Sequence, residues 1–421
     1  MTALASFTAP SPDVSDRVVR IGPDHADFVF AAGGLVIQGD RSASIDLPSL
    51  AAVGPGELSR RASDAIARQS GNAAGALVCG LVPFDPQTPP DLFVVEHPKR
   101  LRLDLPAASD RTAGSVVGGR SGDAPGDRAQ AAHESAVHSL TTCRDEAYRS
   151  GVAQALTQID DGALRKVVLA RSIDVTLGDL APGVVWARLA ARNPHGYTFA
   201  VRRTANAGGP DHFLGASPEL VAEVDAAGFA THPLAGSTPR SGEALTDSAR
   251  GRALLASDKD RREHGFVVDH IVERLRPLLR RLDVPSGPGL FATDAMLHLG
   301  TRLTGSLRPG VSSLQAALTI HPTPAVCGVP TLDALEAIRR IEQADRGCYA
   351  GLVGWQDADG HGQWALALRC ARVRAGHARL FAGAGVVAGS TPDAEHAETA
   401  AKFATMTAAL TAASTTTGGT R

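Results

Sequence analysis

Residues 381–402 read FAGAGVVAGSTPDAEHAETAAK, and the remaining sequence is interpreted outward from this stretch. An apolar strand with Gly383 and Gly385 leads through a Ser/Thr/Pro loop into an alanine-rich helix. Glu395, Glu398 and Lys402 follow at i, i+3 and i+7, so they share one helical face. Two carboxylates and an ammonium group beside a glycine-containing strand end form a candidate site for a hard cation and a small carboxylate. Taken alone, the stretch favours the alternative, a solvated helix face with an intrahelical Glu398–Lys402 pair.

The composition indicates a globular protein without a charged partner surface. The 421 residues are 43% hydrophobic and 20% charged, with a net charge of −2, so nothing in the overall charge favours nucleic acid or an anionic membrane. The five cysteines are scattered and never form a CxxC pair, which argues against a disulfide framework or a zinc site. The N-terminus lacks the pattern of a signal peptide, and no apolar run is long enough to span a bilayer. We therefore expect a cytoplasmic protein.

The order of the predicted elements indicates an α+β fold. Short strands separated by glycine and tight turns alternate in groups with helices, which is typical of antiparallel layers and not of a parallel βαβ sheet. We expect one helix over 59–70, one over 135–159, and a longer one from Ser257 to about Arg280 with a kink near Pro277. Strands over 348–355, 364–373 and 379–387, joined by tight turns, predict an antiparallel meander.

The same reading divides the chain. Residues 1–15 and 413–421 are low in pattern and are expected to be disordered. Residues 16–412 are expected to form one domain, with an N-terminal part over 16–132 and a catalytic core over 133–412. A Gly/Ser/Asp/Arg-rich loop over 107–132 marks the boundary between the two parts and is expected to be mobile.

Carboxylates near the start of the long helix could hold a cation. Ser257 and Asp260 resemble a capping box, and Asp260 and Glu263 flank an apolar stripe that must face the protein. Burying carboxylates is costly unless a cation compensates them. Simple complementation of the helix dipole explains the two residues equally well.

Two further charged residues stand beside buried strands. Lys166 precedes the apolar run VVLA and either extends to solvent or acts as a base. Glu219 follows a strand and a proline turn, where either a catalytic acid or an ordinary surface glutamate would stand.

Arg369 lies within a predicted strand, where a cation normally has an anionic partner. The segment HPTPAVCG over 321–328 is stiff and poor in side chains, as in a wall against a ligand or in a plain rigid turn.

Together these segments resemble the chorismate-utilising enzymes, the family of isochorismate, salicylate, anthranilate and aminodeoxychorismate synthases. The resemblance covers about residues 135–410. The matching motifs are Lys166-Val-Val-Leu-Ala-Arg, Gly215-Ala-Ser-Pro-Glu-Leu, Pro233-Leu-Ala-Gly-Ser, Leu255-Ala-Ser-Asp-Lys-Asp-Arg-Arg-Glu-His, His321-Pro-Thr-Pro-Ala-Val-Cys-Gly, Tyr349-Ala-Gly-Leu-Val-Gly-Trp, Leu368-Arg-Cys-Ala and Phe381-Ala-Gly-Ala-Gly-Val-Val, followed by the helix with Glu398 and Lys402. The resemblance implies two stacked antiparallel sheets flanked by helices, with a Mg²⁺-dependent site in the cleft between the halves.

Within the family, three positions sort the members. Lys166 implies a water nucleophile, because the resemblance places glutamine there in anthranilate synthases. Ala235 replaces the lysine that aminodeoxychorismate synthases use covalently. Ala325 and the string HPTPA match isochorismate synthases, whereas salicylate synthases carry threonine. The resemblance therefore implies an isochorismate synthase of the siderophore type, without a glutamine amidotransferase subunit and acting as a monomer.

The resemblance also implies roles for single residues. Lys166, deprotonated through local positive charge and partial burial, would be the base that activates water, and Glu219, kept protonated, would be the acid that protonates the leaving hydroxyl. The other implied roles are Mg²⁺ held by Glu263 and Glu398, with Asp260 and Glu395 supporting it through water; a carboxylate receptor of Tyr349, Arg369, Lys402 and the amides near Gly383 and Gly385; His298 near the leaving hydroxyl; and Ala325 in the wall. The alternatives are a salicylate synthase with added pyruvate-lyase activity, a menaquinone-pathway isochorismate synthase, an anthranilate-type synthase and a non-catalytic scaffold.

Overall fold

The computed structural model describes residues 21–69, 75–102, 142–177, 180–204, 209–342 and 344–411. The predicted disordered ends at 1–15 and 413–421 and the predicted mobile loop at 107–132 lie outside these ranges. In the part of the chain that is described, no helix has the length and apolar character needed to cross a membrane.

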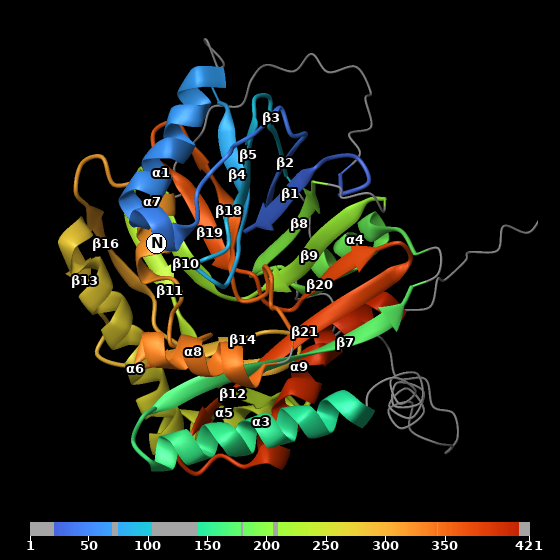
Figure 1. The fold of residues 1–421 in the computed structure, drawn as a ribbon, viewed down its shortest axis with the longest axis vertical. Helices are drawn as coiled ribbons and strands as arrows, with labels where there is room; N and C mark the ends of the chain where they lie inside the picture. Colours follow the sequence, from blue (N-terminus) through green and yellow to red (C-terminus); the bar gives the residue numbers. More distant parts are fainter. Residues whose placement is uncertain are drawn as a thin grey trace, which may run out of the picture.

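Two nine-stranded sheets and one three-stranded sheet, all antiparallel, make up the fold (Figure 1). Sheet A has the order β17 (Gly328–Val329), β7 (Lys166–Thr176), β21 (His377–Val387), β20 (Cys370–Arg374), β9 (Asp211–Ser217), β8 (Tyr197–Arg203), β1 (Phe28–Ala32), β2 (Leu35–Gly39) and β6 (Lys99–Arg102). Sheet B has the order β13 (Leu279–Asp283), β16 (Leu303–Leu307), β11 (Gly228–His232), β10 (Leu220–Asp225), β19 (Gly362–Leu366), β18 (Leu352–Asp357), β4 (Leu77–Val82), β5 (Asp91–Val95) and β3 (Ala43–Ser44). Sheet C consists of β12 (Leu234–Pro239), β15 (Met296–Gly300) and β14 (Gly289–Ala292).

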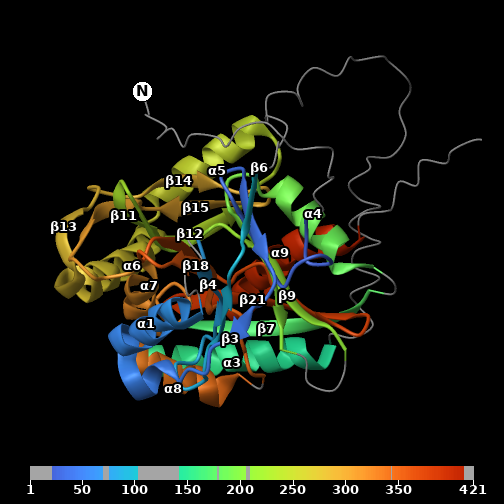
Figure 2. The same cartoon turned by 90° about the horizontal axis from the view of Figure 1, so that it is seen from above.

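Helices flank these sheets, so the predicted α+β architecture is confirmed. They are α1 (Leu50–Gln69), α3 (Thr142–Asp160), α4 (Pro182–Arg192), α5 (Ala244–Ala256), α6 (Asp258–Leu275), α7 (Ser313–Ile320), α8 (Thr331–Ile341) and α9 (Pro392–Thr411). Helices α3 and α8 lie beside β7, and Figure 2 shows sheet C and α5 on the opposite side of the molecule. Both large sheets contain strands from before and after residue 132, so the two parts of the chain share one core.

Strand alternation explains how the layers close. In β1, Phe28 and Phe30 face the core between the sheets, while Val29 and Ala31 face α4 and α9 on the outer side. Sheet A is therefore apolar on both faces, and each face has its own cover.

The chain crosses between the sheets in pairs of strands. β9 pairs with β20 in sheet A, and their continuations β10 and β19 pair in sheet B. Likewise β11 pairs with β16 in sheet B, and β12 pairs with β15 in sheet C. Two ribbons thus pass from one sheet to another, and residues at both crossings line one cavity.

Three element predictions were wrong in detail. The strand over 364–373 is two strands in different sheets, broken where Arg369 has a φ of 44°, so the meander is two separate hairpins. The long helix ends at Leu275, and a 3-10 turn with Pro277 leads into a strand at Leu279. Helix α1 begins at Leu50, nine residues earlier than expected, with a kink at Gly54 before Pro55.

Candidate active site

A cavity of about 90 Å³ lies where the crossings meet α6 and α9. Every predicted site residue except Lys166 and Glu395 lines it. The lining members are Glu219, Asp260, Glu263, His298, Ala325, Tyr349, Arg369, Gly383, Gly385, Glu398 and Lys402. Segments spread over almost two hundred residues therefore converge on one small polar space.

Lys166 lies directly against this lining, at the first position of β7. Its side chain is fully buried, and Nζ lies 2.8 Å from Oε1 of Glu263 on α6. We expected partial burial near positive charge; instead burial is complete and the nearest charged partner is a carboxylate. Burial raises the pKa of the Glu263 carboxyl, but the charge and hydrogen bond of Lys166 outweigh that effect, so the pKa lies below its usual value.

Glu219 stands at the crossing from β9 to β10. It is buried, and burial raises its pKa to about 8, although the Leu234 backbone and the cations Lys166, Arg369 and Lys402 act in the opposite direction. The carboxyl group therefore carries a proton at neutral pH, as a general acid must.

Arg369 stands at the return crossing, beside Glu219. The two crossings are hydrogen-bonded to each other, from Leu366 N–H to the Glu219 carbonyl (3.1 Å) and from Ala216 N–H to the Arg369 carbonyl (3.1 Å). No side chain in the described ranges forms a hydrogen bond or ion pair with the Arg369 guanidinium, although Glu219 and Glu398 act on it at longer range. Among the described residues, the predicted anionic partner of this arginine is therefore not found as a salt bridge.

The second ribbon brings His298 and Ala235 to the same cavity, on β15 and β12. His298 is buried, and burial together with Arg369 and Lys402 lowers its pKa well below the usual value, so the imidazole is neutral. Its Nε2 atom has no hydrogen-bond partner among the described residues. A neutral imidazole without a partner can serve a substrate hydroxyl as donor or acceptor.

Lys402 on α9 connects its helix to β21. Its Nζ lies 2.6 Å from Oε1 of Glu398, one helical turn earlier, and donates to the Gly383 carbonyl at 2.8 Å. The intrahelical pair of the alternative interpretation therefore exists, but it faces a cavity and not open solvent. Because the N–H and C=O of one strand residue point to the same side, Gly383 and, two residues on, Gly385 present their backbone groups to the cavity side.

The two glycines also give room to neighbouring side chains of the candidate site. A Cβ atom on Gly385 would lie 2.7 Å from Oε1 of Glu263 and 3.2 Å from Cε of Lys166. A Cβ atom on Gly383 would lie 2.9 Å from the hydroxyl oxygen of Tyr349, whose ring stacks on Phe381 with centroids 5.4 Å apart. Glycine at these two positions of β21 therefore leaves the space that Glu263, Lys166 and Tyr349 occupy.

The carboxylates of the cavity fit a cation that keeps much of its water. Asp260 follows the observed cap, in which Ser257 Oγ accepts from Asp260 N–H at 3.2 Å. Glu395 lies buried behind the lining, 4.0 Å from Lys259, and its pKa is raised by burial and by Glu398 and Glu263. Within the described ranges, the carboxylates of Asp260, Glu263, Glu395 and Glu398 do not place three ligand atoms within 4.8 Å of one another. In this part of the chain, only Asp357, Asp359 and His361, which lie in a turn, do so. Two direct carboxylates with water suit Mg²⁺, whereas a closed protein cage is not present.

Arg346 is the principal lining residue that sequence reasoning missed. It forms an ion pair with Glu342 just before the matched Tyr349 motif. A charged pair at i and i+4 directly ahead of a matched motif was the available signal. Ser237 and Lys259 also line the cavity and were not predicted.

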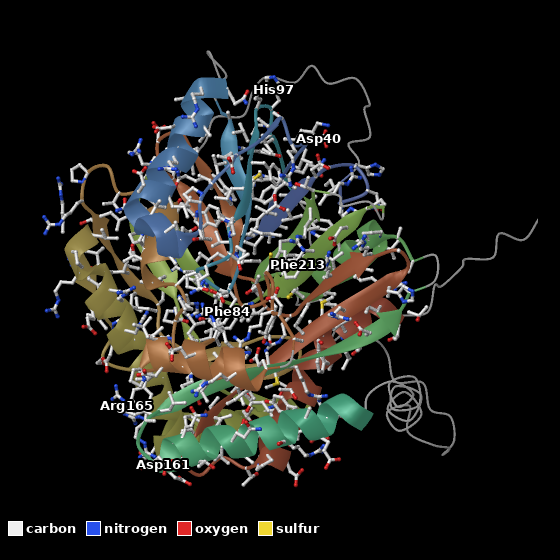
Figure 3. The ribbon with its side chains drawn as sticks, viewed as in Figure 1. Asp40, Phe84, His97, Asp161, Arg165 and Phe213 are labelled. Atoms are coloured by element: carbon white, nitrogen blue, oxygen red, sulfur yellow. The ribbon has the colours of Figure 1, made fainter. Side chains whose placement is uncertain are left out.

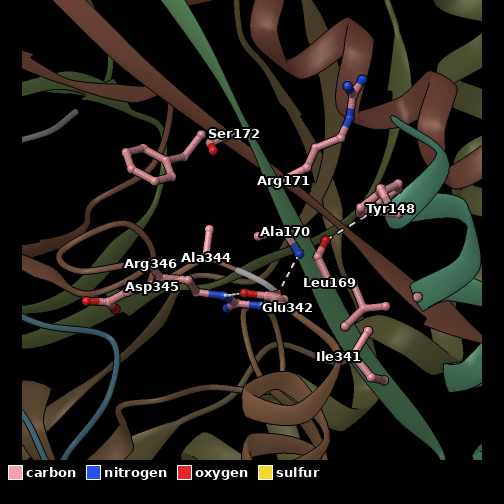
Figure 4. A pocket seen from close by; sticks show the side chains of 13 residues that line it. Tyr148, Leu169, Ala170, Arg171, Ser172, Ile341, Glu342, Ala344, Asp345 and Arg346 are labelled. Atoms are coloured by element: carbon pink, nitrogen blue, oxygen red, sulfur yellow. Dashed lines mark hydrogen bonds and ion pairs between the residues drawn. The ribbon is translucent and has the colours of Figure 1, made fainter. Parts of the chain in front are cut away.

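A larger cavity of about 290 Å³ lies on the other side of Arg346, between α3, β7 and the loop after α8 (Figure 4). Among the residues predicted for the site, none lines it. The predicted site residues therefore gather at the smaller cavity and not at this larger one.

A family model described as "Chorismate binding enzyme" matches residues 121–411. The chain belongs to this family. It is 41% identical over 359 residues to "Isochorismate synthase DhbC" of Bacillus subtilis, covering 84% of this chain and 85% of that protein. It is 37% identical over 332 residues to "Isochorismate synthase EntC" of Escherichia coli K12, covering 78% of this chain and 80% of that protein.

Solved structures of the family agree with the fold. A putative 2,3-dihydroxybenzoate-specific isochorismate synthase, DhbC from Bacillus anthracis, superposes with a TM-score of 0.77 at 36% identity, covering 91% of this chain and 96% of the other. Anthranilate synthase component I from Streptococcus pneumoniae gives 0.63 at 20% identity, over 94% and 95% of the two chains, and shares the fold alone. The predicted membership of the chorismate-utilising enzymes is therefore confirmed.

Proposed function

We propose that this enzyme is an isochorismate synthase, which converts chorismate to isochorismate with Mg²⁺. One observation carries the proposal: Glu219, which keeps its proton with a pKa of about 8, lines the cavity whose lining residue Glu263 is bonded to Lys166, the lysine predicted as base. Relatives of 37–41% identity that are named isochorismate synthases support the same reaction.

In the proposed reaction, Lys166 acts in its neutral amine form and accepts a proton from water as the water oxygen bonds to C2 of the ring. The diene electrons shift, the C4–O bond breaks, and Glu219 donates its proton to the departing hydroxyl, which leaves as water. One water enters and one leaves, so the reaction is an isomerisation, and the proton returns from Lys166 to Glu219 through solvent. His298 would orient the hydroxyl, because its neutral imidazole has a nitrogen free for this contact.

Chorismate is a dianion, and the site offers cations for it. Arg369, with no protein partner in the described structure, and Lys402 would bind the enolpyruvyl carboxylate together with Tyr349 and the amides near Gly383 and Gly385. Ala325 would form the wall next to that group.

Mg²⁺ would be held by Glu263 and Glu398, with Asp260 and Glu395 supporting it through water. When bound, the ion would supply positive charge for the ring carboxylate. The mutual effect of these carboxylates on the pKa of Glu395 supports a cation here, because like charges at short range are costly without one.

Chromatography of the purified protein with chorismate and Mg²⁺ tests the proposal. We expect isochorismate without salicylate or pyruvate, and loss of the product peak when a chelator removes the metal. Unchanged chorismate would refute the enzyme assignment, and a pyruvate peak would indicate the salicylate synthase alternative.

For the pathway, we propose siderophore biosynthesis. The names of two relatives support it: the 2,3-dihydroxybenzoate-specific protein from Bacillus anthracis and a vibriobactin-specific synthase of Vibrio cholerae at 39% identity over 341 residues. Deletion in the source organism tests this, with growth under iron limitation restored by 2,3-dihydroxybenzoate or salicylate. Rescue by menaquinone alone would indicate the other pathway.

A further inference from the structure

Arg346 forms the wall between the two cavities. It lines both the catalytic cavity and the larger outer cavity, and its side chain is almost fully buried. Figure 4 shows its guanidinium lying along the Glu342 carboxylate, with the two groups joined in the view from the outer cavity.

The guanidinium of Arg346 joins two backbone segments of the active site. It donates to the Val168 carbonyl at 2.7 Å, and Val168 lies two residues after Lys166 on β7. It also donates to the Val326 carbonyl at 2.8 Å, and Val326 follows Ala325 in the substrate wall. β7 and this segment are also paired directly, with Val168 N–H donating to the Cys327 carbonyl at 2.7 Å, so the guanidinium adds side-chain bonds to an existing backbone contact.

Glu342 holds the guanidinium in this orientation. Its carboxylate accepts two hydrogen bonds from Arg346, of which that from Nε is 2.9 Å, and it accepts the Ala170 N–H at 2.7 Å. Glu342 thus binds both the arginine and β7 itself. A planar, bidentate arrangement of this kind is specific to arginine, because a lysine ammonium cannot make these contacts together.

The N-terminal part of the chain completes the enclosure. The Phe84 ring centroid lies 4.1 Å from the guanidinium carbon of Arg346, and Phe84 N–H donates to the Gly347 carbonyl at 3.0 Å. Figure 3 places Phe84 near the middle of the molecule. Residues outside the catalytic core therefore contribute to the wall through this arginine.

We propose that Arg346 is a positioning residue for the reaction: beyond the backbone pairing of the two segments, its bonds to the Val168 and Val326 carbonyls hold the Ala325 wall in one orientation against the Lys166 strand. We expect it to act more on the rate of the chemical step than on substrate affinity, because its guanidinium bonds neither Arg369 nor Lys402 of the proposed carboxylate receptor, and it contacts Tyr349 only through its carbonyl, which accepts the Tyr349 N–H at 3.0 Å. This inference rests on the proposed function, since its readout is isochorismate formation.

The test is Arg346→Lys, which keeps the charge and loses the planar fork. Misplacement of reacting groups by about 1 Å can cost on the order of 100-fold. We therefore expect kcat to fall at least about 10-fold while KM changes less than about threefold. Circular dichroism at the assay temperature measures the folded fraction, to which each kcat is normalised.

Arg339→Lys is the matched control. Arg339 lies on α8 and forms a similar fork with Asp85, but this pair is partly exposed and does not line the catalytic cavity. We expect its kcat and KM to stay within about twofold of the wild type, as is typical of an exposed pair. Inactive wild type and control would refute the proposed function, whereas an active control with an unaffected Arg346→Lys would refute only the positioning role.

Two further measurements keep the inference open to refutation if Arg346→Lys folds poorly. Glu342→Gln should lower normalised kcat in the same direction with KM preserved, because one partner of the fork is weakened. Guanidinium at concentrations that do not unfold the protein should partly restore kcat in Arg346→Ala, since the outer cavity abuts this position, whereas urea should not. A normal kcat in Glu342→Gln, or losses fully explained by folded fraction, would show that the role is structural only.

Discussion

Two lysine–glutamate pairs lie at the same cavity and differ in how the chain makes them. Lys166 and Glu263 come from β7 and α6, and the lysine side chain is completely buried. Lys402 and Glu398 lie one turn apart on α9, with side-chain exposures of 15% and 33%. The first pair exists only when the sheet and the helix have assembled, whereas the second can form in an isolated helix.

The difference shows that contact type does not reveal role. An i,i+4 pair contributes about 0.2–0.5 kcal/mol to a helix, so the second pair is not needed for stability. A buried lysine with one carboxylate partner is costly to place and costly to disturb, so its position is determined by the fold. We infer that Lys166 of the buried pair acts in the chemical step and Lys402 of the partly buried pair in binding.

Replacement of Lys166 should have the largest effect. In Lys166→Met we expect kcat to fall on the order of 100- to 10,000-fold, the usual contribution of a general base, while chorismate still binds. Product chromatography measures kcat, and calorimetric titration measures the binding of chorismate. Lys99→Met, at an exposed strand position, is the control and should behave as wild type. Normal turnover in Lys166→Met would refute the assigned base.

Glu219→Gln should follow, with a distinctive pH dependence. The folded pKa of about 8 lies above the ordinary 4.5, so the folded wild type retains a proton that the unfolded chain releases between these values. Both states are protonated below about pH 4.5, and above it the wild type loses stability as pH rises to about 8, by up to about 1.4 kcal/mol per pH unit. Glu219→Gln lacks this loss, so its melting temperature relative to wild type should increase through that window.

The pH dependence of wild-type activity should also reflect the ionisation of Glu219. We expect kcat/KM to decline above about pH 8 as Glu219 ionises in the free enzyme, since a general acid must be protonated. Glu219→Gln should have low activity without this decline. A flat wild-type profile from pH 7 to 9.5 would contradict the assignment of Glu219 as the acid.

Much of this site could be predicted because its residues lie in short motifs. Lys166, Glu263 and Glu398 carry the family pattern in the sequence, and the structure brings them to one place. The burial of Lys166 against Glu263 could not be predicted, because the pairing joins residues almost a hundred positions apart. We expected positive charge next to Lys166, but its nearest charged partner is the Glu263 carboxylate.

Arg369 shows why the strand prediction failed. The residues around it are apolar on both sides of the break, because β19 packs in the core between the sheets and β20 has apolar side chains on both faces, Cys370 in that core and Ala371 in the outer one, so the sequence pattern stays continuous. Only the backbone at Arg369, with its φ of 44°, reveals the crossing. Arg346 was missed for a related reason: its acceptors Val168 and Val326 are backbone carbonyls, which leave no trace in residue types.

Lys402→Met tests the partly buried intrahelical pair and should have a smaller effect than Lys166→Met. We expect KM to rise about 10- to 100-fold, the range for loss of a hydrogen bond to a charged group, with kcat nearly preserved. The melting temperature should change little, because the lost helix pair is weak. A fall in kcat with unchanged KM would reverse the roles that we assign to the two pairs.

The smallest effects should come from the two glycines that serve these pairs. In Gly385→Ala, the new Cβ would displace Glu263 and Lys166, whose flexible ends can move slightly, so we expect kcat to fall about 10-fold or less. In Gly383→Ala, the new Cβ would instead meet the Tyr349 hydroxyl in the proposed carboxylate receptor, and KM should rise several-fold while kcat holds. Gly265→Ala on α6, where a Cβ meets nothing within 4 Å, is the control and should gain stability from helix propensity. Steady-state kinetics of the three variants give kcat and KM separately. If the same one of these parameters changes in both Gly383→Ala and Gly385→Ala, the two lysine–glutamate pairs do not divide catalysis from binding.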